Sequence, residues 1–166
     1  MENQIITDLK AGRVVTVPTE TVYGFAVSLS SKTGIKSLME YKERGKESGK
    51  VFTLVPESVA AIKKYAIITK CAKELIKQYV PGEITIILPK NPKFRHFYYD
   101  CFDTIGIRIP DYSMFQNLLK AVGPIILTSA NKKGGTPKSD TGHLPSTIVD
   151  CTGETPRVIR QGNLVI

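Results

Sequence analysis

The stretch Thr104–Ser129, TIGIRIPDYSMFQNLLKAVGPIILTS, places a short β-type run on each side of a helical run. Residues 104–109 and 125–129 have the short apolar pattern of strands, and residues 113–122 have the pattern of a helix. Similar runs alternate before and after this stretch. Strands that alternate with helices, some of them adjacent in sequence, predict an α/β fold whose sheet is mixed rather than purely parallel.

The rest of the chain continues this alternation. Further helices are expected at residues 2–10, around 35–42, from Pro56 to about Tyr65, and at 69–79. Further strands are expected at residues 13–17, 25–28, 51–55, 84–88, 146–150 and 157–160. No repeat, low-complexity segment or long Ser/Gly linker divides the chain, so residues 1–166 are predicted to form a single domain.

The composition is that of a globular protein, with 42% hydrophobic and 23% charged residues. No apolar run approaches the roughly 20 residues of a membrane span, and the N-terminus lacks a basic n-region and a signal-peptide core. We therefore expect a cytoplasmic protein without membrane contact. The net charge of +8 favours polyanionic partners such as a nucleotide, pyrophosphate or RNA, although solvated lysine-rich helices explain it as well.

The cysteines and histidines form no recognisable catalytic or metal motif. Cys71, Cys101 and Cys151 are too far apart for a CxxC pattern and are expected to be plain core residues. His96 and His143 have no paired metal-ligand spacing, so we expect surface or structural histidines and no metal site. Because a GxSxG elbow is also absent, an enzyme with this sequence is expected to work by positioning and charge neutralisation.

Small and polar residues gather where the expected strands end, which is where α/β proteins usually bind ligands. Residues 18–24 (PTETVYG) offer hydroxyls and a carboxylate, or an ordinary turn. Residues 42–50 (KERGKESGK) suit phosphate groups, or a helix end whose cations complement its dipole. Residues 128–137 (TSANKKGGTP) suit an anion cradle, or a surface turn. Thr85 has the pattern of an ordinary strand residue.

Taken in order, these segments resemble the hallmarks of the YrdC/TsaC family of threonylcarbamoyl-AMP synthases. The matching segments are residues 18–24, 42–50, 81–85 (PGEIT), 106–110 (GIRIP), 128–137, 146–150 (STIVD) and 159–162 (IRQG). The resemblance covers nearly the whole chain. It implies a YrdC-like fold, a twisted mixed α/β sheet with flanking helices and a concave basic surface.

The resemblance also implies a nucleotidyltransferase. L-threonine, bicarbonate or CO2, and ATP would give L-threonylcarbamoyl-AMP and pyrophosphate, the first step of threonylcarbamoyladenosine modification of tRNA. The downstream partners would be tRNA threonylcarbamoyltransferase proteins. ATP would be a substrate, accompanied by Mg²⁺, with no tightly bound prosthetic group. A cationic pocket would stabilise the charge that develops as a carbamate oxygen meets the α-phosphate.

The family motifs imply roles for particular residues of this chain. Arg44 and Lys50 would be catalytic and meet the triphosphate. Threonine would be bound by Thr19, Arg108 and Ser146, with Arg108 on the carboxylate. The nucleotide would be held by Lys42, Arg44, Lys50, Thr85, Ser129, Asn131, Ser139 and Arg160.

The chain departs from the family pattern at several positions. Glu83 stands where the PGPxT motif has its second proline, and Gly45 stands where a proline follows the first basic cluster. The segment 45–50 is about two residues longer than in the family, so Lys50 is aligned less closely than Arg44. Gly134 replaces the serine of the family's SG pair.

Two other functions remain open on the sequence. One is a double-stranded RNA-binding module of the same fold without synthase activity. The other is the carbamoyl-transfer domain of hydrogenase maturation proteins, which is normally embedded in a much longer chain. Residues 132–142, which are Gly-rich and polar, are a candidate for a loop that closes over ATP.

Overall fold

A computed structural model describes residues 1–45 and 48–166. Within these residues the strands form one eight-stranded sheet in the order β1-β2-β6-β3-β5-β4-β7-β8. The strands are β1 (Val15–Val17), β2 (Gly24–Ser28), β3 (Thr53–Val55), β4 (Ile84–Pro89), β5 (Thr104–Ile107), β6 (Ile125–Ser129), β7 (Thr147–Asp150) and β8 (Arg157–Arg160). The helices are α1 (Glu2–Lys10), α2 (Lys32–Tyr41), α3 (Ile62–Tyr65), α4 (Lys70–Tyr79) and α5 (Ser113–Val122), with a 3₁₀ turn, η2, at Tyr99–Cys101.

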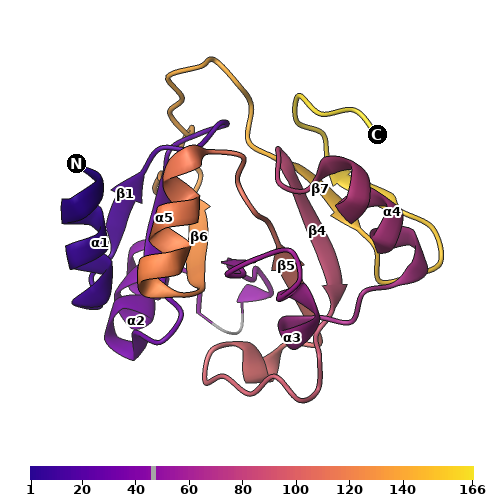
Figure 1. The fold of residues 1–166 in the computed structure, drawn as a ribbon, viewed down its shortest axis with the longest axis horizontal. Helices are drawn as coiled ribbons and strands as arrows, with labels where there is room; N and C mark the ends of the chain where they lie inside the picture. Colours follow the sequence, from indigo (N-terminus) through magenta and orange to yellow (C-terminus); the bar gives the residue numbers. More distant parts are fainter. Residues whose placement is uncertain (46–47) are drawn as a thin grey trace.

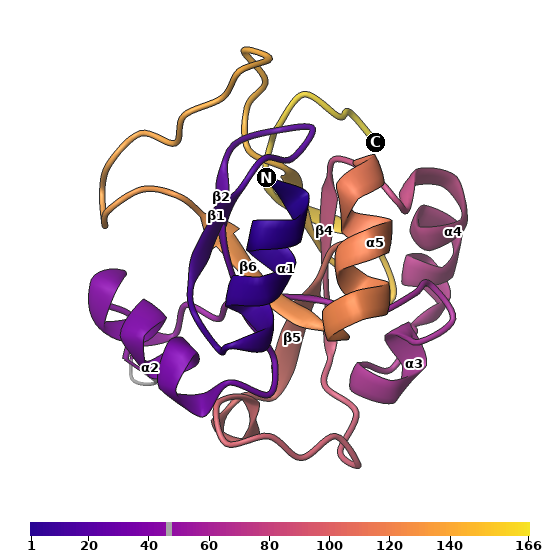
Figure 2. The ribbon, with the colours of Figure 1, turned by 60° about the vertical axis from the view of Figure 1, so that its left-hand side comes forward.

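The sheet is mixed, as the sequence predicts. The pairs β3–β5 and β4–β7 are parallel, and the other neighbouring pairs are antiparallel. Figure 1 shows β1 and β6 at one end of the molecule and β4 and β7 at the other. The segment between β6 and β7 runs as a long loop outside the sheet (Figure 2).

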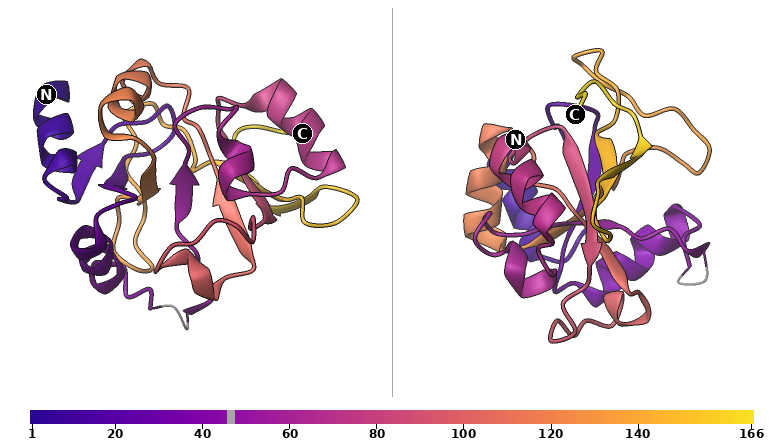
Figure 3. Two further views of the ribbon diagram at one scale, coloured as in Figure 1. Left: turned by 60° about the horizontal axis from the view of Figure 1, so that its bottom comes forward. Right: turned by 90° about the vertical axis from the view of Figure 1, so that its right-hand side faces the viewer.

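Helices cover the two faces of the sheet unequally. The right-hand view of Figure 3 shows α3, α4 and α5 on one side and α2 on the other. Each strand contributes side chains to both faces of the sheet, because successive side chains of a strand point to opposite faces. In β6, Ile125 and Leu127 belong to one cluster with Leu118 of α5 and Leu9 of α1, while Ile126 belongs to a second cluster, which includes residues of α2, α3 and α4.

Local signals place the helix starts. The hydroxyl of Ser31 accepts a hydrogen bond from the backbone N–H of Gly34 at the start of α2, and that of Thr69 accepts from Ala72 at the start of α4. These are N-caps, which satisfy otherwise unpaired N–H groups of the first turn. At the other end of α5, Gly123 ends the helix at a φ of 82°, a conformation that glycine adopts without steric cost.

The helix expected from Pro56 to Tyr65 is shorter in the structure. Only Ile62–Tyr65 is α-helical, and turns and bends precede it. The backbone N–H of Ala61 bonds to both the carbonyl and the hydroxyl of Ser58, at 3.2 and 3.1 Å. A serine that hydrogen-bonds to the nearby backbone favours a turn over a continued helix, so the expected first turns were wrong.

Two other expectations need correction. The strand expected at 104–109 ends at Ile107. Cys151 is buried and Cys71 is partly buried, but Cys101 is exposed on the 3₁₀ turn, so it is not a core residue. Across the described ranges, no helix is long and apolar enough to cross a membrane.

Candidate functional site

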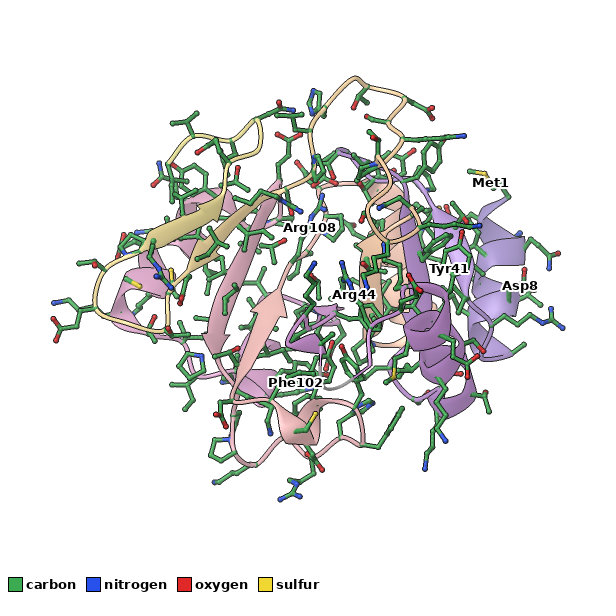
Figure 4. The ribbon with its side chains drawn as sticks, turned by 180° about the vertical axis from the view of Figure 1, so that it is seen from behind. Met1, Asp8, Tyr41, Arg44, Phe102 and Arg108 are labelled. Carbon is green, nitrogen blue, oxygen red and sulfur yellow. The ribbon has the colours of Figure 1, made fainter. Side chains whose placement is uncertain are left out.

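A cleft of about 550 Å³ lies where the central strands meet the loops around them. Its volume falls in the range typical of small-molecule sites, roughly 300–1,000 Å³. Figure 4 shows this face, with Arg44 and Arg108 near each other at its centre. Among its lining residues are eight that the sequence predicts: Thr19, Arg44, Lys50, Thr85, Arg108, Ser129, Ser146 and Arg160.

Strand β5 and the residue after it supply three alternate positions to the cleft, Thr104, Gly106 and Arg108. Alternate residues of a strand share one face, which explains the spacing. A Cβ atom on Gly106 would lie 3.4 Å from Cγ2 of Thr85, so glycine keeps this part of the wall open. Thr104 is not among the site residues that the sequence predicts, although its two-residue spacing from Gly106 and Arg108 is a signal that could have found it.

The pairing of β4 with β7 joins two hydroxyls that are far apart in the sequence. In the parallel ladder Thr85 lies opposite Ile148. Ser146, two residues before Ile148, is therefore on the same face as Thr85, and their side-chain oxygens are 2.8 Å apart. Both residues are buried at the cleft wall. The pattern around Thr85 fits a plain strand residue, but its position makes it available to a ligand; its role as a nucleotide ligand stays a prediction.

Two arginines place positive charge in the cleft. Nη1 of Arg44 donates to the Thr128 hydroxyl at 3.3 Å, and its guanidinium carbon lies 5.6 Å from the centre of the Phe52 ring. Nε and Nη2 of Arg160 donate to the Ser146 carbonyl at 3.1 and 2.8 Å. Burial lowers the pKa of both arginines.

The arginines are also close enough to repel one another. After burial, the charges of Arg108 and Arg44 are the further causes that lower the pKa of Arg160. Cations that are held together against their repulsion are stabilised by a bound anion, because it offsets the unfavourable Coulomb energy. The cleft therefore suits an anionic ligand.

The 18–24 segment is both a tight turn and a wall of the cleft. The Thr19 hydroxyl donates to the Val22 carbonyl at 2.7 Å and accepts from the backbone N–H of Thr21 at 3.1 Å. Nη2 of Arg108 donates to Oε1 of Glu20 and to the Thr21 hydroxyl, each at 2.9 Å. The turn thus orients Arg108 as well as Thr19.

Lys42 does not line the cleft. Its side chain is 1% exposed, and Nζ donates to the backbone carbonyls of Ser129 and Asn131 at 2.9 and 2.7 Å. Burial, and then the charge of Arg44, lowers the pKa of Lys42 to about 8. Lys42 therefore stabilises the end of β6 and the loop that follows it.

Asn131 and Ser139 also lie outside the cleft lining. Nδ2 of Asn131 donates to the carbonyls of Lys132 and Gly135, at 2.8 and 3.0 Å, and so shapes the turn. The Ser139 hydroxyl donates to the carbonyl of Thr21 at 2.6 Å. In this structure both residues hold loops, and their contact with a nucleotide stays a prediction.

Lys50 is exposed and lines the cleft, and its backbone N–H donates to the Ser48 hydroxyl at 3.3 Å. The greater length of the segment 45–50 relative to the family pattern stays a prediction from the sequence. Lys46 and Glu47 of that segment lie outside the described residues.

Two hydrogen bonds of Tyr23 connect the 132–142 loop to the turn that contains this tyrosine. The backbone N–H of Tyr23 donates to the Lys138 carbonyl at 2.9 Å, and its hydroxyl donates to the Asp140 carboxylate. Just beyond the loop, His143 pairs with Glu83, the residue that replaces the family's proline. The Glu83 side chain therefore contacts His143 and does not line the cleft.

His96 has a structural role. Its Nε2 lies 2.8 Å from the Leu29 carbonyl, and its Nδ1 accepts from the backbone N–H of Tyr98 at 3.1 Å. In the part of the chain that the structure describes, no group of three or more His, Cys, Asp or Glu residues could hold a metal ion.

Comparison with known proteins gives consistent similarities. The sequence profile of the Sua5/YciO/YrdC family, described as telomere recombination, matches residues 7–144. A threonylcarbamoyl-AMP synthase of Vibrio campbellii is 30% identical over 89% of this chain and 80% of its own length. The human threonylcarbamoyl-AMP synthase is 31% identical over 76% of this chain, which spans 44% of the human protein. A structure of P. abyssi Sua5 superimposes with a TM-score of 0.85 at 25% identity, covering 98% of this chain and 54% of that protein.

Proposed function

Because the chain belongs to the Sua5/YciO/YrdC family, we propose that it makes L-threonylcarbamoyl-AMP from L-threonine, bicarbonate or CO2, and ATP, with release of pyrophosphate. The relatives that carry the name threonylcarbamoyl-AMP synthase support this activity. The observation that carries it is the cleft in which Arg44, Arg108 and Arg160 lie close together. Every substrate in this reaction is either anionic or, for threonine and CO2, forms an anionic carbamate.

Two groups of cleft residues fit the two kinds of substrate. Arg108 and Thr19 offer an arginine nitrogen and a hydroxyl to the carboxylate and hydroxyl of threonine, with Ser146 beside them. Arg44 and Lys50 offer a planar fork and a mobile point charge, which are the groups that bind phosphates. The triphosphate would therefore lie toward Arg44 and the amino acid toward Arg108.

The proposed reaction needs no covalent intermediate. A carbamate oxygen attacks the α-phosphorus of ATP, a new P–O bond forms, the bond to the β-phosphate oxygen breaks, and pyrophosphate carries away the charge. The protein contributes by aligning two anions that repel each other and by neutralising the charge that develops. Mg²⁺ would enter as the MgATP substrate complex and would screen the phosphates.

The test is pyrophosphate release measured with each substrate omitted in turn. We expect release only when threonine, bicarbonate and ATP are all present. Arg44→Ala should raise the KM for ATP by about tenfold or more, because a charge-assisted contact is lost, while circular dichroism stays unchanged. ATP turnover that is indifferent to threonine would remove the synthase assignment.

The RNA-binding function remains the second candidate, and the net charge of +8 favours it. If double-stranded RNA binds, its affinity should fall steeply with salt, because phosphate contacts release counterions. An RNA interaction that is undetectable or insensitive to salt would count against it. The downstream tRNA threonylcarbamoyltransferase proteins also stay a prediction.

A further inference from the structure

Among the three arginines of the cleft, only Arg108 has a carboxylate partner in the described structure. Oε1 of Glu20 lies 2.9 Å from Nη2 of Arg108, and both side chains are largely buried, with 16% and 7% of their surface exposed. Arg44 and Arg160 instead donate to a hydroxyl and to a backbone carbonyl. Glu20 therefore offsets the charge of Arg108, whereas the charges of Arg44 and Arg160 have no carboxylate partner in the described structure.

The hydrogen bonds of Arg108 leave one nitrogen for a ligand. Nη2 has two hydrogens, and they are directed to Glu20 and to the Thr21 hydroxyl. Nε is buried without a partner. Nη1 makes no hydrogen bond within the described residues and is not among the buried unpaired atoms, and Arg108 lines the cleft. A ligand thus meets Nη1 alone rather than the paired fork of the guanidinium.

Within the described residues, the Glu20 carboxylate accepts a hydrogen bond from Arg108 alone. Its second oxygen, Oε2, is buried and has no hydrogen-bond partner in the described structure. Leaving a buried carboxylate oxygen unpaired is unfavourable, so the arrangement costs stability.

We propose that Glu20 is a positioning and specificity-determining residue of the amino-acid end of the cleft. It holds Arg108 so that Nη1 meets a carboxylate, and its negative charge keeps phosphate groups from occupying that end. A carboxylate carries one negative charge and a pyrophosphate group carries more, so the charge of Glu20 repels pyrophosphate more strongly than it repels a carboxylate. This proposal rests on the proposed function, because it takes threonine as the amino acid.

The experiment compares Glu20→Gln and Glu20→Ala with the unchanged protein. A control variant, Glu57→Gln, removes the same charge outside the cleft lining, where Glu57 accepts from Lys64 and Tyr65. For each protein, the rate of L-threonylcarbamoyl-AMP formation gives the KM for threonine and for ATP, and added pyrophosphate gives the inhibition constant in competition with threonine. Thermal unfolding is recorded in parallel.

We expect Glu20→Ala to raise the KM for threonine by about tenfold or more, as for the loss of a charge-assisted hydrogen bond, with the KM for ATP nearly unchanged. Glu20→Gln keeps an acceptor for Nη2, so its KM for threonine should rise less. Both variants should be inhibited more strongly by pyrophosphate in competition with threonine. Glu57→Gln should resemble the unchanged protein in all three constants.

Two results would overturn the proposal. One is an equal rise in both KM values that follows a lower melting temperature, which indicates a purely structural role. The other is pyrophosphate inhibition in Glu20→Gln that equals that of Glu57→Gln. If the unchanged protein itself shows no threonine-dependent release, the proposed function fails; if it does and the Glu20 variants match it, only this inference fails.

Discussion

Replacing Lys42 by methionine separates two roles for this buried lysine. The sequence predicts that Lys42 binds ATP, whereas the structure places Nζ against the carbonyls of Ser129 and Asn131, outside the cleft lining. Methionine keeps an unbranched side chain of similar length but has no donor. The two carbonyls therefore lose their ammonium partner.

The size of the effect follows from these contacts. A hydrogen bond to a charged group contributes about 1.5–3 kcal/mol, and the cost of burying the ammonium group offsets part of the two bonds. We expect the free energy of unfolding to fall by about 3 kcal/mol. Because Ser129 lies at the cleft, the KM for ATP should rise as well, by roughly tenfold.

The pH dependence has a definite sign. The pKa of Lys42 is about 8 in the folded protein, below the value of about 10.4 expected in the unfolded chain. Between these values the unfolded chain binds more protons, so Lys42 makes the free energy of unfolding rise with pH across this window. Below about pH 8 the contribution is level, and Lys42→Met should lack the rise.

The assay is urea unfolding at several pH values together with ATP kinetics. Lys36→Met, which removes an exposed lysine of α2, is the matched control and should differ little from the unchanged protein. Unchanged stability in Lys42→Met would refute the supporting role. A raised KM for ATP without any loss of stability would instead indicate that Lys42 contacts the nucleotide directly.

Two further predictions follow from burial and packing. Gly106→Val should fill the wall beside Thr85 and lower the affinity for ATP or threonine by about tenfold or more, as titration calorimetry would measure; unchanged affinities would place the ligands elsewhere. Under native conditions Cys101 should react with a maleimide first, because it is exposed. Cys151 should react last, because burial raises the pKa of its thiol to about 12 and the thiolate is the reactive form. Peptide mass spectrometry gives the order, and early labelling of Cys151 would contradict this burial.

Several parts of this protein follow from local sequence patterns. The helix at 113–122 and the strand at 125–129 have the predicted limits, because periodicity and the glycine after the helix act through neighbouring residues. The mixed sheet also follows from the alternation of runs. The helix expected from Pro56 does not form over its full length, because the Ser58 hydroxyl competes for a backbone N–H. Hydrophobic periodicity does not reveal this competition.

The ordered motifs indicate the family and the residues that gather at the cleft, but their contacts are set by distant pairing. Thr85 meets Ser146 only because β4 lies parallel to β7. Lys42, in a basic cluster that suits phosphate, turns to the carbonyls beyond β6, and Glu20 reaches an arginine 88 residues away. Local propensity determined the elements of this protein and their order; only the tertiary structure decided which polar groups satisfy one another and which remain free for a ligand, because buried polar groups find partners by position in space.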